Sequence, residues 1–441
     1  MNFKSTWSIL FLFPAILATS SLRAQSQEIS LSPTSNAASL PNYAKGVNLA
    51  GGEYAPGPNG VYGTAYMYPT TQEFDYYKSK GFSIVRLPFD IARLQPASMS
   101  ALNQSELAHI TAAVEYARQI GMYIILDPHN YGKMWDQQMN GYQPIGPSPY
   151  VIPDSYFADF WRRLSTVYKN YPNVIYGLMN EPNMQSPTSW KTSAVTAINA
   201  IRTVSTTQVI FIPGTAFTTA ATWVTSGNAA AWTGYKDPAG GPFAFEMHQY
   251  LDSNYSGTSS QCVTGYGSTV LKDATNWLAA NGYRGFIGEF DWFNDFGQSG
   301  GTVSSQCQTE GTALLNAMQA APQQWSGWTW WGSGPWAWNN GVNLDPGADG
   351  KAGDQPQTAT LVQYLTANTG SLTTDTSSQT ASTSAPTTST SSQTTNTSSQ
   401  TASTSAPTTN TSTQTTSASA PTTSTSSPTT NTSRHRRHRA Q

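Results

Sequence analysis

Short apolar runs recur along the central part of the chain. Each is five to seven residues long and almost continuous in apolar residues, which is typical of strands in a parallel sheet buried on both faces. Eight such runs are predicted as strands: residues 46–50, 82–87, 122–128, 174–179, 208–213, 243–248, 285–290 and 326–331.

Between several of these runs, apolar residues recur at helical spacing. Residues 105–121, 155–171 and 190–204 each place their apolar side chains on one face of a predicted helix. Eight strands alternating with amphipathic helices predict an α/β fold, the (β/α)₈ TIM barrel. A doubly wound open sheet is the alternative, but no glycine-rich phosphate-binding turn follows the first run.

The beginning of the chain has a different composition from this central part. Residues 1–24 contain Lys4 and an apolar run that is too short to span a bilayer. They predict a secretory signal peptide, and a retained membrane anchor is the alternative. Residues 25–41 are predicted to form a flexible lead-in, and residues 42–369 to form one folded domain.

The end of the chain is dominated by Ser, Thr and Pro. Residues 370–433 repeat the sequence SSQTASTSAPTT almost intact at 377–388 and 398–409. Such a tract cannot bury apolar surface, so a disordered tail is predicted. Residues 434–441 form a basic end, which either attaches to an acidic surface or is a solvated tail.

Charge and composition narrow the range of ligands. The net charge is −2, only 10% of residues are charged and 12% are aromatic. There is no basic footprint for nucleic acid. A weakly charged, aromatic-rich domain suits a neutral, hydroxylated ligand such as a sugar, whose C–H faces pack on aromatic rings.

The chain has two cysteines, Cys262 and Cys307. Disulfides persist in oxidising compartments, so a disulfide between them is expected after export. Two free buried thiols are the alternative.

Polar side chains gather where the predicted strands end. In a barrel of this kind the chemistry lies at the carboxyl ends of the strands. The candidates there are Arg86, His129, Asn130, Asn180, Glu181, His248, Tyr250, Glu289 and Trp331.

Two of these candidates are glutamates on strands that nearly face each other across the barrel. Glu181 ends the fourth predicted strand and Glu289 ends the seventh. Glycoside cleavage needs two such carboxyl groups, one protonated and one ionised. Arg86 and the Tyr250 hydroxyl are expected to stabilise ionised Glu289, whose charge would then keep Glu181 protonated.

Seven segments, spread over residues 46 to 334, resemble glycoside hydrolase family 5, and more narrowly its branch of fungal and related bacterial endo-β-1,4-glucanases. They are GVNLAGGEY, VRLPFD, ILDPHNYGKMW, YGLMNEPN, MHQYLDSNYSGTSSQCV, FIGEFDW and WTWWGSG. The resemblance implies that Glu181 is the acid/base and Glu289 the nucleophile, and that the other candidates bind or support the substrate. It also favours a Cys262–Cys307 bridge. Asn183 departs from the family, in which His is common at this position.

Further tryptophans lie in the predicted loops at this end of the barrel. Trp135, Trp292, Trp336 and Trp338 are candidates for sugar stacking. For each one, the alternative is that it packs its loop against the barrel. Together they predict an extended aromatic cleft, which indicates cleavage at internal bonds of a polymer.

We therefore expect a secreted, retaining endo-β-1,4-glucanase that acts by double displacement through a covalent glycosyl-enzyme intermediate. A β-mannanase or xyloglucanase on the same barrel, and a non-catalytic carbohydrate-binding adhesin, are the alternatives. A metal-dependent hydrolase is disfavoured because no HExxH motif appears. No metal or cofactor is expected. The predicted partner is a β-1,4-glucan, with no nucleic acid and no membrane span after signal removal, and the protein is expected to be a monomer.

Overall fold

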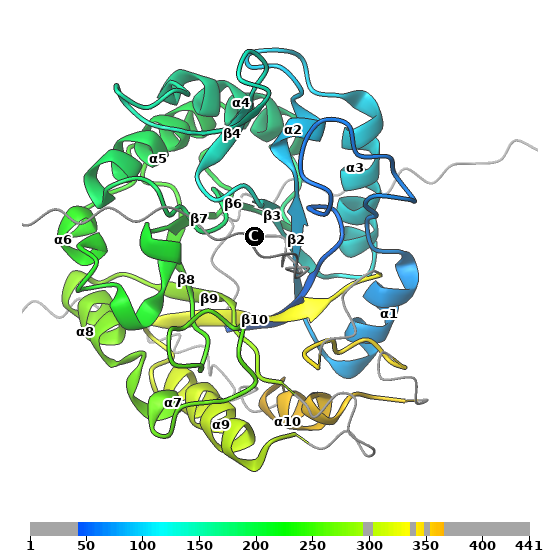
Figure 1. The fold of residues 1–441 in the computed structure, drawn as a ribbon, viewed down its shortest axis with the longest axis vertical. Helices are drawn as coiled ribbons and strands as arrows, with labels where there is room; N and C mark the ends of the chain where they lie inside the picture. The colour runs from blue at the N-terminus through cyan, green and yellow to red at the C-terminus, as the bar shows by residue number, and fades with distance from the viewer. Residues whose placement is uncertain (1–42, 294–302, 336–340, 348–352, 366–441) are drawn as a thin grey trace, which may run out of the picture.

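Eight parallel strands close into a barrel in the computed structural model, which describes residues 43–293, 303–335, 341–347 and 353–365 (Figure 1). The order around the ring is β1, β10, β9, β8, β7, β6, β3, β2. Because β1 pairs with both β2 and β10, the ring is closed and the open-sheet alternative is excluded. The strands are β1 (Ala44–Leu49), β2 (Ile84–Phe89), β3 (Tyr123–Pro128), β6 (Val174–Gly177), β7 (Ile210–Pro213), β8 (Phe243–His248), β9 (Gly285–Glu289) and β10 (Trp325–Ser333). All eight predicted runs are strands.

Helices surround the ring, as Figure 1 shows. The three predicted from periodicity are α3 (Gln104–Gln119), α4 (Asp154–Tyr168) and α5 (Pro187–Arg202). Side chains cap two of their amino ends: Asn103 accepts hydrogen bonds at the start of α3, and Ser186 at the start of α5. The others are α1 (Thr71–Lys80), α2 (Ile91–Leu94), α6 (Asn228–Trp232), α7 (Tyr266–Thr269), α8 (Lys272–Asn281), α9 (Ser305–Ala320), α10 (Pro356–Leu365) and the short 3₁₀ turns η1 (Ala216–Thr218) and η2 (Ala220–Thr222).

The inside of the barrel is apolar where the strands begin. Phe211 of β7 and Phe286 of β9 stack with ring centroids 4.6 Å apart, although β8 lies between their strands. Their contact therefore crosses the interior. The complete apolar plug consists of Ala44, Ile84, Ile125, Ile175, Val209, Phe211, Ala244 and Phe286.

Further along the strands, the same inward face becomes polar. Side chains two positions apart on a strand share a face. Arg86 therefore follows Ile84 into the barrel, Asp127 follows Ile125, and Glu246 and His248 follow Ala244. All four polar groups are buried, so the carboxyl end of the barrel holds a cluster of charges above the apolar plug.

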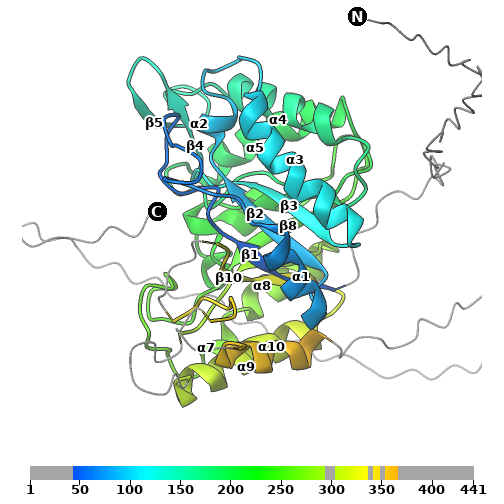
Figure 2. The ribbon, with the colours of Figure 1, turned by 90° about the vertical axis from the view of Figure 1, so that its right-hand side faces the viewer.

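A two-stranded hairpin follows β3 and was not among the predicted elements. Its strands are β4 (Lys133–Asp136) and β5 (Gly141–Pro144), which pair antiparallel. Figure 2 shows the hairpin projecting beyond the barrel strands. It brings Trp135 and Tyr142 together in an edge-to-face contact, with ring centroids 5.3 Å apart.

The predicted disulfide is confirmed. Cys262, in the loop after β8, is bonded to Cys307 on α9. Within the described residues, none of the helices has the length and apolar character needed to cross a membrane. The predicted signal peptide, lead-in, Ser/Thr-rich tail and basic end lie outside the described residues, as do Trp336 and Trp338.

Candidate active site

The predicted polar residues converge at the carboxyl end of the barrel. Arg86, fully buried on β2, lies at their centre. Its Nη1 donates to Glu289 Oε1 at 2.8 Å, and its Nη2 donates to Asn180 Oδ1 at 2.8 Å. One guanidinium thus joins a residue after β6 to the predicted nucleophile on β9.

Three further partners of Arg86 were not predicted as site residues. The Arg86 Nη1 donates to Asn48 Oδ1 at 3.0 Å and lies 3.1 Å from Asp127 Oδ2, and its Nε lies 2.8 Å from Glu246 Oε1. The signal for Glu246 was present in the sequence, because it precedes His248 by two positions on one strand. Asp127, Glu246 and Glu289 thus share the single charge of Arg86, and its loss would leave buried carboxylates without their common partner.

Glu289 is held as a carboxylate. Burial raises its pKa, but the charges of His248 and Arg86 and the hydrogen bond from the Tyr250 hydroxyl outweigh burial and lower the pKa to about 2. The Tyr250 hydroxyl donates to Glu289 Oε2 at 2.7 Å. Glu289 is therefore ionised at neutral pH, as a nucleophile must be.

Glu181 has the opposite tendency. Burial and the negative charge of Glu289 raise its pKa, although a hydrogen bond with His248 acts against them. The Glu181 Oε1 lies 2.7 Å from His248 Nδ1. Its backbone is left-handed, with φ of 40°, an uncommon conformation for a non-glycine residue that is often found at functional sites.

The two carboxyl groups lie close together. One ligand-type atom each from Glu181, His248 and Glu289 lie within 4.8 Å of one another. In glycoside hydrolases, carboxyl groups about 5–5.5 Å apart act with retention, whereas inversion needs about 6.5–9.5 Å to admit a water. The separation of Glu181 and Glu289 therefore suits direct attack on the sugar by one carboxylate.

By their positions alone, the same three residues could hold a metal ion. A ligating imidazole must offer a lone pair. Burial lowers the pKa of His248, but the charge of Glu289 and the hydrogen bonds with Glu181 and Glu246 raise it to about 10. His248 therefore carries both ring protons at neutral pH, so these residues fit a network that shares protons better than a metal site.

His129 and Trp331 form one wall of the site. Their rings stack 5.3 Å apart at 16°. Because the Asn180 oxygen accepts from Arg86, its amide nitrogen faces His129 Nε2 at 3.1 Å, and His129 Nδ1 lies 2.8 Å from Asp127. Trp331 is partly exposed, which leaves ring surface for a ligand.

Neighbouring aromatic residues divide between the core and the surface. The sugar-stacking prediction for Trp292 is wrong. This side chain is 1% exposed, and it packs edge-on against Trp330 at 4.7 Å and against Gly311 of α9. The segment after Glu289 turns outward between the barrel and α9, so Trp292 fills the core. Trp135 is partly exposed, and its role in stacking stays a prediction.

Two more observations concern residues at the rim. Asn130 uses its side chain within the fold: Oδ1 accepts from the Ile91 amide and Nδ2 donates to Asp90, so it supports the site. Phe217 in η1 is a further aromatic residue at the rim that was not predicted. It is 42% exposed, and its amide donates to the carbonyl of Pro182, next to Glu181. No sequence pattern marks its left-handed backbone, with φ of 59°.

The chain shares its sequence and fold with known enzymes. The family model described as Cellulase (glycosyl hydrolase family 5) matches residues 41–334. The endoglucanase gh5-1 of Neurospora crassa is 36% identical over 297 residues, covering 66% of this chain and 70% of the relative.

Two solved structures show the same likeness. The endo-beta-1,4-glucanase Xac0029 of Xanthomonas axonopodis pv. citri is 35% identical with a TM-score of 0.65, covering 73% of this chain and 98% of that chain. The structure of XacCel5A in complex with cellopentaose is 37% identical with a TM-score of 0.65, covering 74% of this chain and 99% of that chain.

A closed barrel with two unlike carboxyl groups at its mouth is the arrangement of a glycoside hydrolase. More narrowly, the chain belongs to the cellulase family, glycosyl hydrolase family 5.

Proposed function

We propose that the protein is an endo-β-1,4-glucanase that cleaves with net retention, with Glu289 as the nucleophile and Glu181 as the acid/base. The observation that carries this proposal is the pair itself: two carboxyl groups, with one oxygen of each within 4.8 Å of the other, whose pKa values are shifted in opposite directions. The names of the relatives, and the cellopentaose bound to one of them, support β-1,4-glucan as the substrate.

In the first step, a Glu289 oxygen attacks the anomeric carbon of the bound sugar. The bond from that carbon to the glycosidic oxygen breaks, and Glu181 gives its proton to the departing oxygen. The Arg86 and Tyr250 contacts hold the Glu289 carboxylate in place for this attack. The products are a covalent glycosyl-enzyme and a chain with a new free hydroxyl.

In the second step, water releases the sugar. Glu289 is neutral in the ester, so its charge no longer raises the pKa of Glu181. Glu181, now ionised, accepts a proton from a water whose oxygen attacks the anomeric carbon. The ester bond breaks, and Glu289 is released as a carboxylate. Both glutamates return to their starting protonation states.

Surrounding residues orient the sugar. In this proposal the Asn180 amide, which contacts Arg86 and His129, binds a hydroxyl of the reacting unit, and the Trp331 ring forms an apolar floor. The partly exposed Trp135 and the exposed Phe217 extend this surface on elements that follow β3 and β7. Aromatic surfaces spread along the rim suit a polymer bound across the mouth.

Stereochemistry and substrate range test the proposal. Proton NMR of the product formed first from cellopentaose is expected to show the β-anomer before mutarotation, and an α-anomer would contradict retention. Carboxymethylcellulose should lose viscosity early relative to its release of reducing ends, as internal cleavage requires. Faster release from mannan or xyloglucan would favour those activities, and no hydrolysis of any of the three would favour an adhesin.

We also propose that the enzyme is secreted and acts as a monomer. The Cys262–Cys307 disulfide supports an oxidising compartment, because disulfides rarely persist in the cytosol. Residues 1–24 serve as the signal peptide, and residues 370–433 and 434–441 form the tail of the exported protein. Mass spectrometry of the exported chain locates its mature amino terminus, and size-exclusion chromatography with light scattering gives its mass.

A further inference from the structure

The loop after β8 is organised by one buried aspartate, Asp252, which is 2% exposed. Its Oδ1 accepts from the amides of Ser256 at 2.7 Å and Gly257 at 3.1 Å. Its Oδ2 accepts from the amides of Thr258 at 3.1 Å and Ser259 at 3.2 Å, and from the Ser256 hydroxyl at 2.8 Å. Because one carboxyl group accepts all five hydrogen bonds, it fixes the path of the loop.

Gly257 brings the loop into contact with the candidate active site. Its φ is +63°, and a Cβ added there would lie 2.4 Å from Cδ1 of Tyr250. The loop backbone therefore lies directly against the Tyr250 ring, which is only 6% exposed. The hydroxyl of the same ring donates to Glu289 Oε2 at 2.7 Å. Asp252 is thus linked to Glu289 through two residues, Gly257 and Tyr250, without a hydrogen bond of its own to either carboxyl group of the pair.

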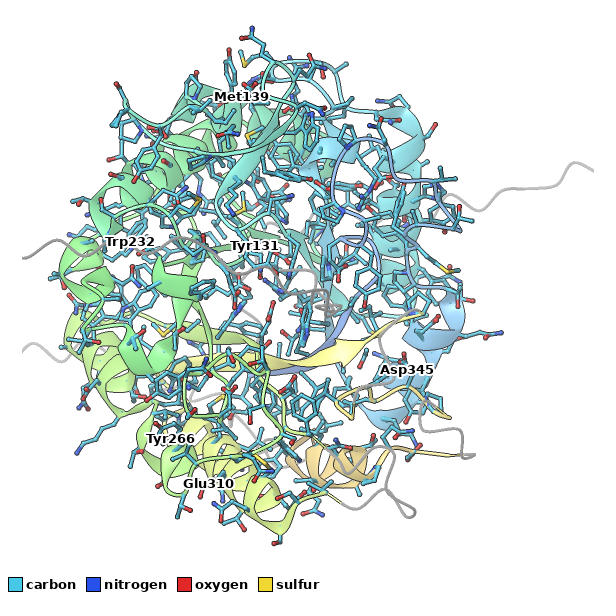
Figure 3. The ribbon with its side chains drawn as sticks, viewed as in Figure 1. Tyr131, Met139, Trp232, Tyr266, Glu310 and Asp345 are labelled. Carbon is cyan, nitrogen blue, oxygen red and sulfur yellow. A yellow bond between two sulfur atoms is a disulfide. The ribbon has the colours of Figure 1, made fainter. Side chains whose placement is uncertain are left out.

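The far end of the loop is fastened to α9. Cys262 is bonded to Cys307 on that helix, and Glu310 accepts from the amides of Gly265 and Gly267 at 2.8 Å each. Figure 3 shows Glu310 on α9, beside the short helix α7. The loop is therefore held at its start by Asp252 and at its end by α9, which limits how far Gly257 can move from Tyr250.

We propose that Asp252 is a positioning residue for the reaction: by gathering the loop amides it presses Gly257 against Tyr250 and holds the Tyr250 hydroxyl on Glu289. This inference rests on the proposed role of Glu289 as nucleophile. It assigns a catalytic consequence to a carboxylate that does not contact the reacting atoms.

Tyr250 is the neutral donor among the groups that face Glu289. The charged and titratable groups around it come from other elements or from the strand before the loop: Arg86, His129, Glu181, Glu246 and His248. These groups stay in place when the loop loosens. A displaced Tyr250 hydroxyl therefore removes one stabilising hydrogen bond and raises the pKa of Glu289. The acid limb of kcat/KM then moves to higher pH.

The test is a double-mutant cycle of Asp252→Asn and Tyr250→Phe, measured on the full chain with carboxymethylcellulose and cellopentaose. The amide introduced by Asp252→Asn would keep one acceptor oxygen and place an N–H donor against the amides of Thr258 and Ser259. We expect a kcat roughly 10-fold lower in each single variant, with KM within about twofold. Both acid limbs move to higher pH, and Asp252→Asn changes neither kcat nor the acid limb further in the Tyr250→Phe background.

A matched control separates positioning from general stability. Asp237 is also a buried aspartate, 8% exposed, that accepts from the loop amides of Ala239 and Gly241 and from Arg202 Nε, and these three partners lie outside the site. Asp237→Asn is expected to lower the melting temperature and leave the acid limb unchanged. An equal shift in this control would overturn the proposal.

A second variant keeps the test decisive if Asp252→Asn fails to fold. Gly257→Ala leaves Asp252 intact and places a methyl against the Tyr250 ring, so the same lowered kcat and shifted acid limb are expected. An unshifted acid limb in whichever of Asp252→Asn and Gly257→Ala folds would refute positioning by Asp252. So would a further 10-fold loss of kcat when Asp252→Asn is added to Tyr250→Phe. Absence of hydrolysis by the wild-type chain would instead refute the proposed function.

Discussion

The two ends of the barrel interior are built from the same strands and differ in chemistry. Near the strand beginnings, Phe211 and Phe286 stack in an apolar plug. Two positions further along, Arg86 meets three carboxylates, and every one of these groups is buried. The apolar end gains its stability from close packing, which depends on the shape and volume of the side chains. The second end depends on paired charges, and it is therefore the end where removing one group changes the protonation of the others.

The largest expected effect comes from the charged end. Glu289→Ala removes the proposed nucleophile and is expected to lower kcat by at least about 10⁴-fold. The variant should still fold and bind cellopentaose, which isothermal titration calorimetry measures. Glu289→Gln is the matched control that keeps the side-chain volume. Residual turnover within 100-fold of the wild type would contradict the assignment.

A pair of variants compares the two ends directly. Arg86→Met leaves the buried carboxylates without their positively charged partner and is expected to lower the free energy of unfolding by about 3–5 kcal/mol. Its turnover should also be nearly lost in the folded fraction. Phe211→Ala opens a cavity in the plug and should cost a similar 3–5 kcal/mol with kcat unchanged. Urea denaturation and initial rates at low temperature distinguish the two. An equal loss of kcat in Arg86→Met and Phe211→Ala would contradict the assignment of catalysis to the charged end alone.

Two tryptophans sharpen the boundary between core and site. Trp292→Ala is expected to lower the free energy of unfolding by about 3–5 kcal/mol, because the ring is buried against Trp330. Trp331→Ala should cost little stability and reduce kcat/KM by roughly 10–100-fold through loss of the proposed sugar contact. Thermal melting and kinetics on cellopentaose measure both. A loss of kcat/KM without a loss of stability in Trp292→Ala would contradict the core position of Trp292 and favour a role in sugar stacking.

The smallest effects are shifts with pH. The His248 charge lowers the pKa of both Glu289 and Glu181. His248→Asn should therefore move both limbs of the kcat/KM profile to higher pH, since Glu289 would protonate earlier on acidification and Glu181 would keep its proton longer on alkalinisation. Unshifted limbs would show that His248 is neutral in the free enzyme.

Stability should follow the same charges. The pKa of Glu289 is lowered from 4.5 to about 2 on folding, so its contribution is present above about pH 4.5 and is lost as the pH falls toward 2. Urea denaturation between pH 2 and pH 6 should show a smaller slope of stability with pH in Glu289→Gln than in the wild type. Identical slopes would mean that Glu289 titrates normally in the folded protein.

The fold could be predicted because its strands are apolar on both faces. Each of the eight runs stood out without any knowledge of pairing, and the pairing of β1 with β10 supplied the closure. The hairpin β4–β5 was missed because the sequences KMWD and GYQP are short and lack strong alternation, although Asn140-Gly141 at the start of β5 is a turn signal. Its pairing depends on contacts with the rest of the barrel mouth.

The site was predictable where a polar residue interrupts the end of an apolar strand, as at Glu181 and Glu289. Glu246 and Asn48 lie inside their strands and become visible only when the inward face is followed two residues at a time. Trp292 and Trp331 each lie close to a strand end, and the sequence does not show which ring turns into the core. Phe217 depends on a backbone conformation that its residue type does not favour.

The central claim is that Glu289 attacks the sugar while Glu181 delivers the proton. The most direct measurement is mass spectrometry of the enzyme inactivated with a 2-deoxy-2-fluoro cellobioside that carries a good leaving group. The fluorine slows release of the covalent sugar, so the adduct accumulates. We predict one adduct per chain, in the peptide that contains Glu289, and none in Glu289→Gln. An adduct on Glu181, or an active enzyme that forms no adduct and gives an inverted product, would contradict the account.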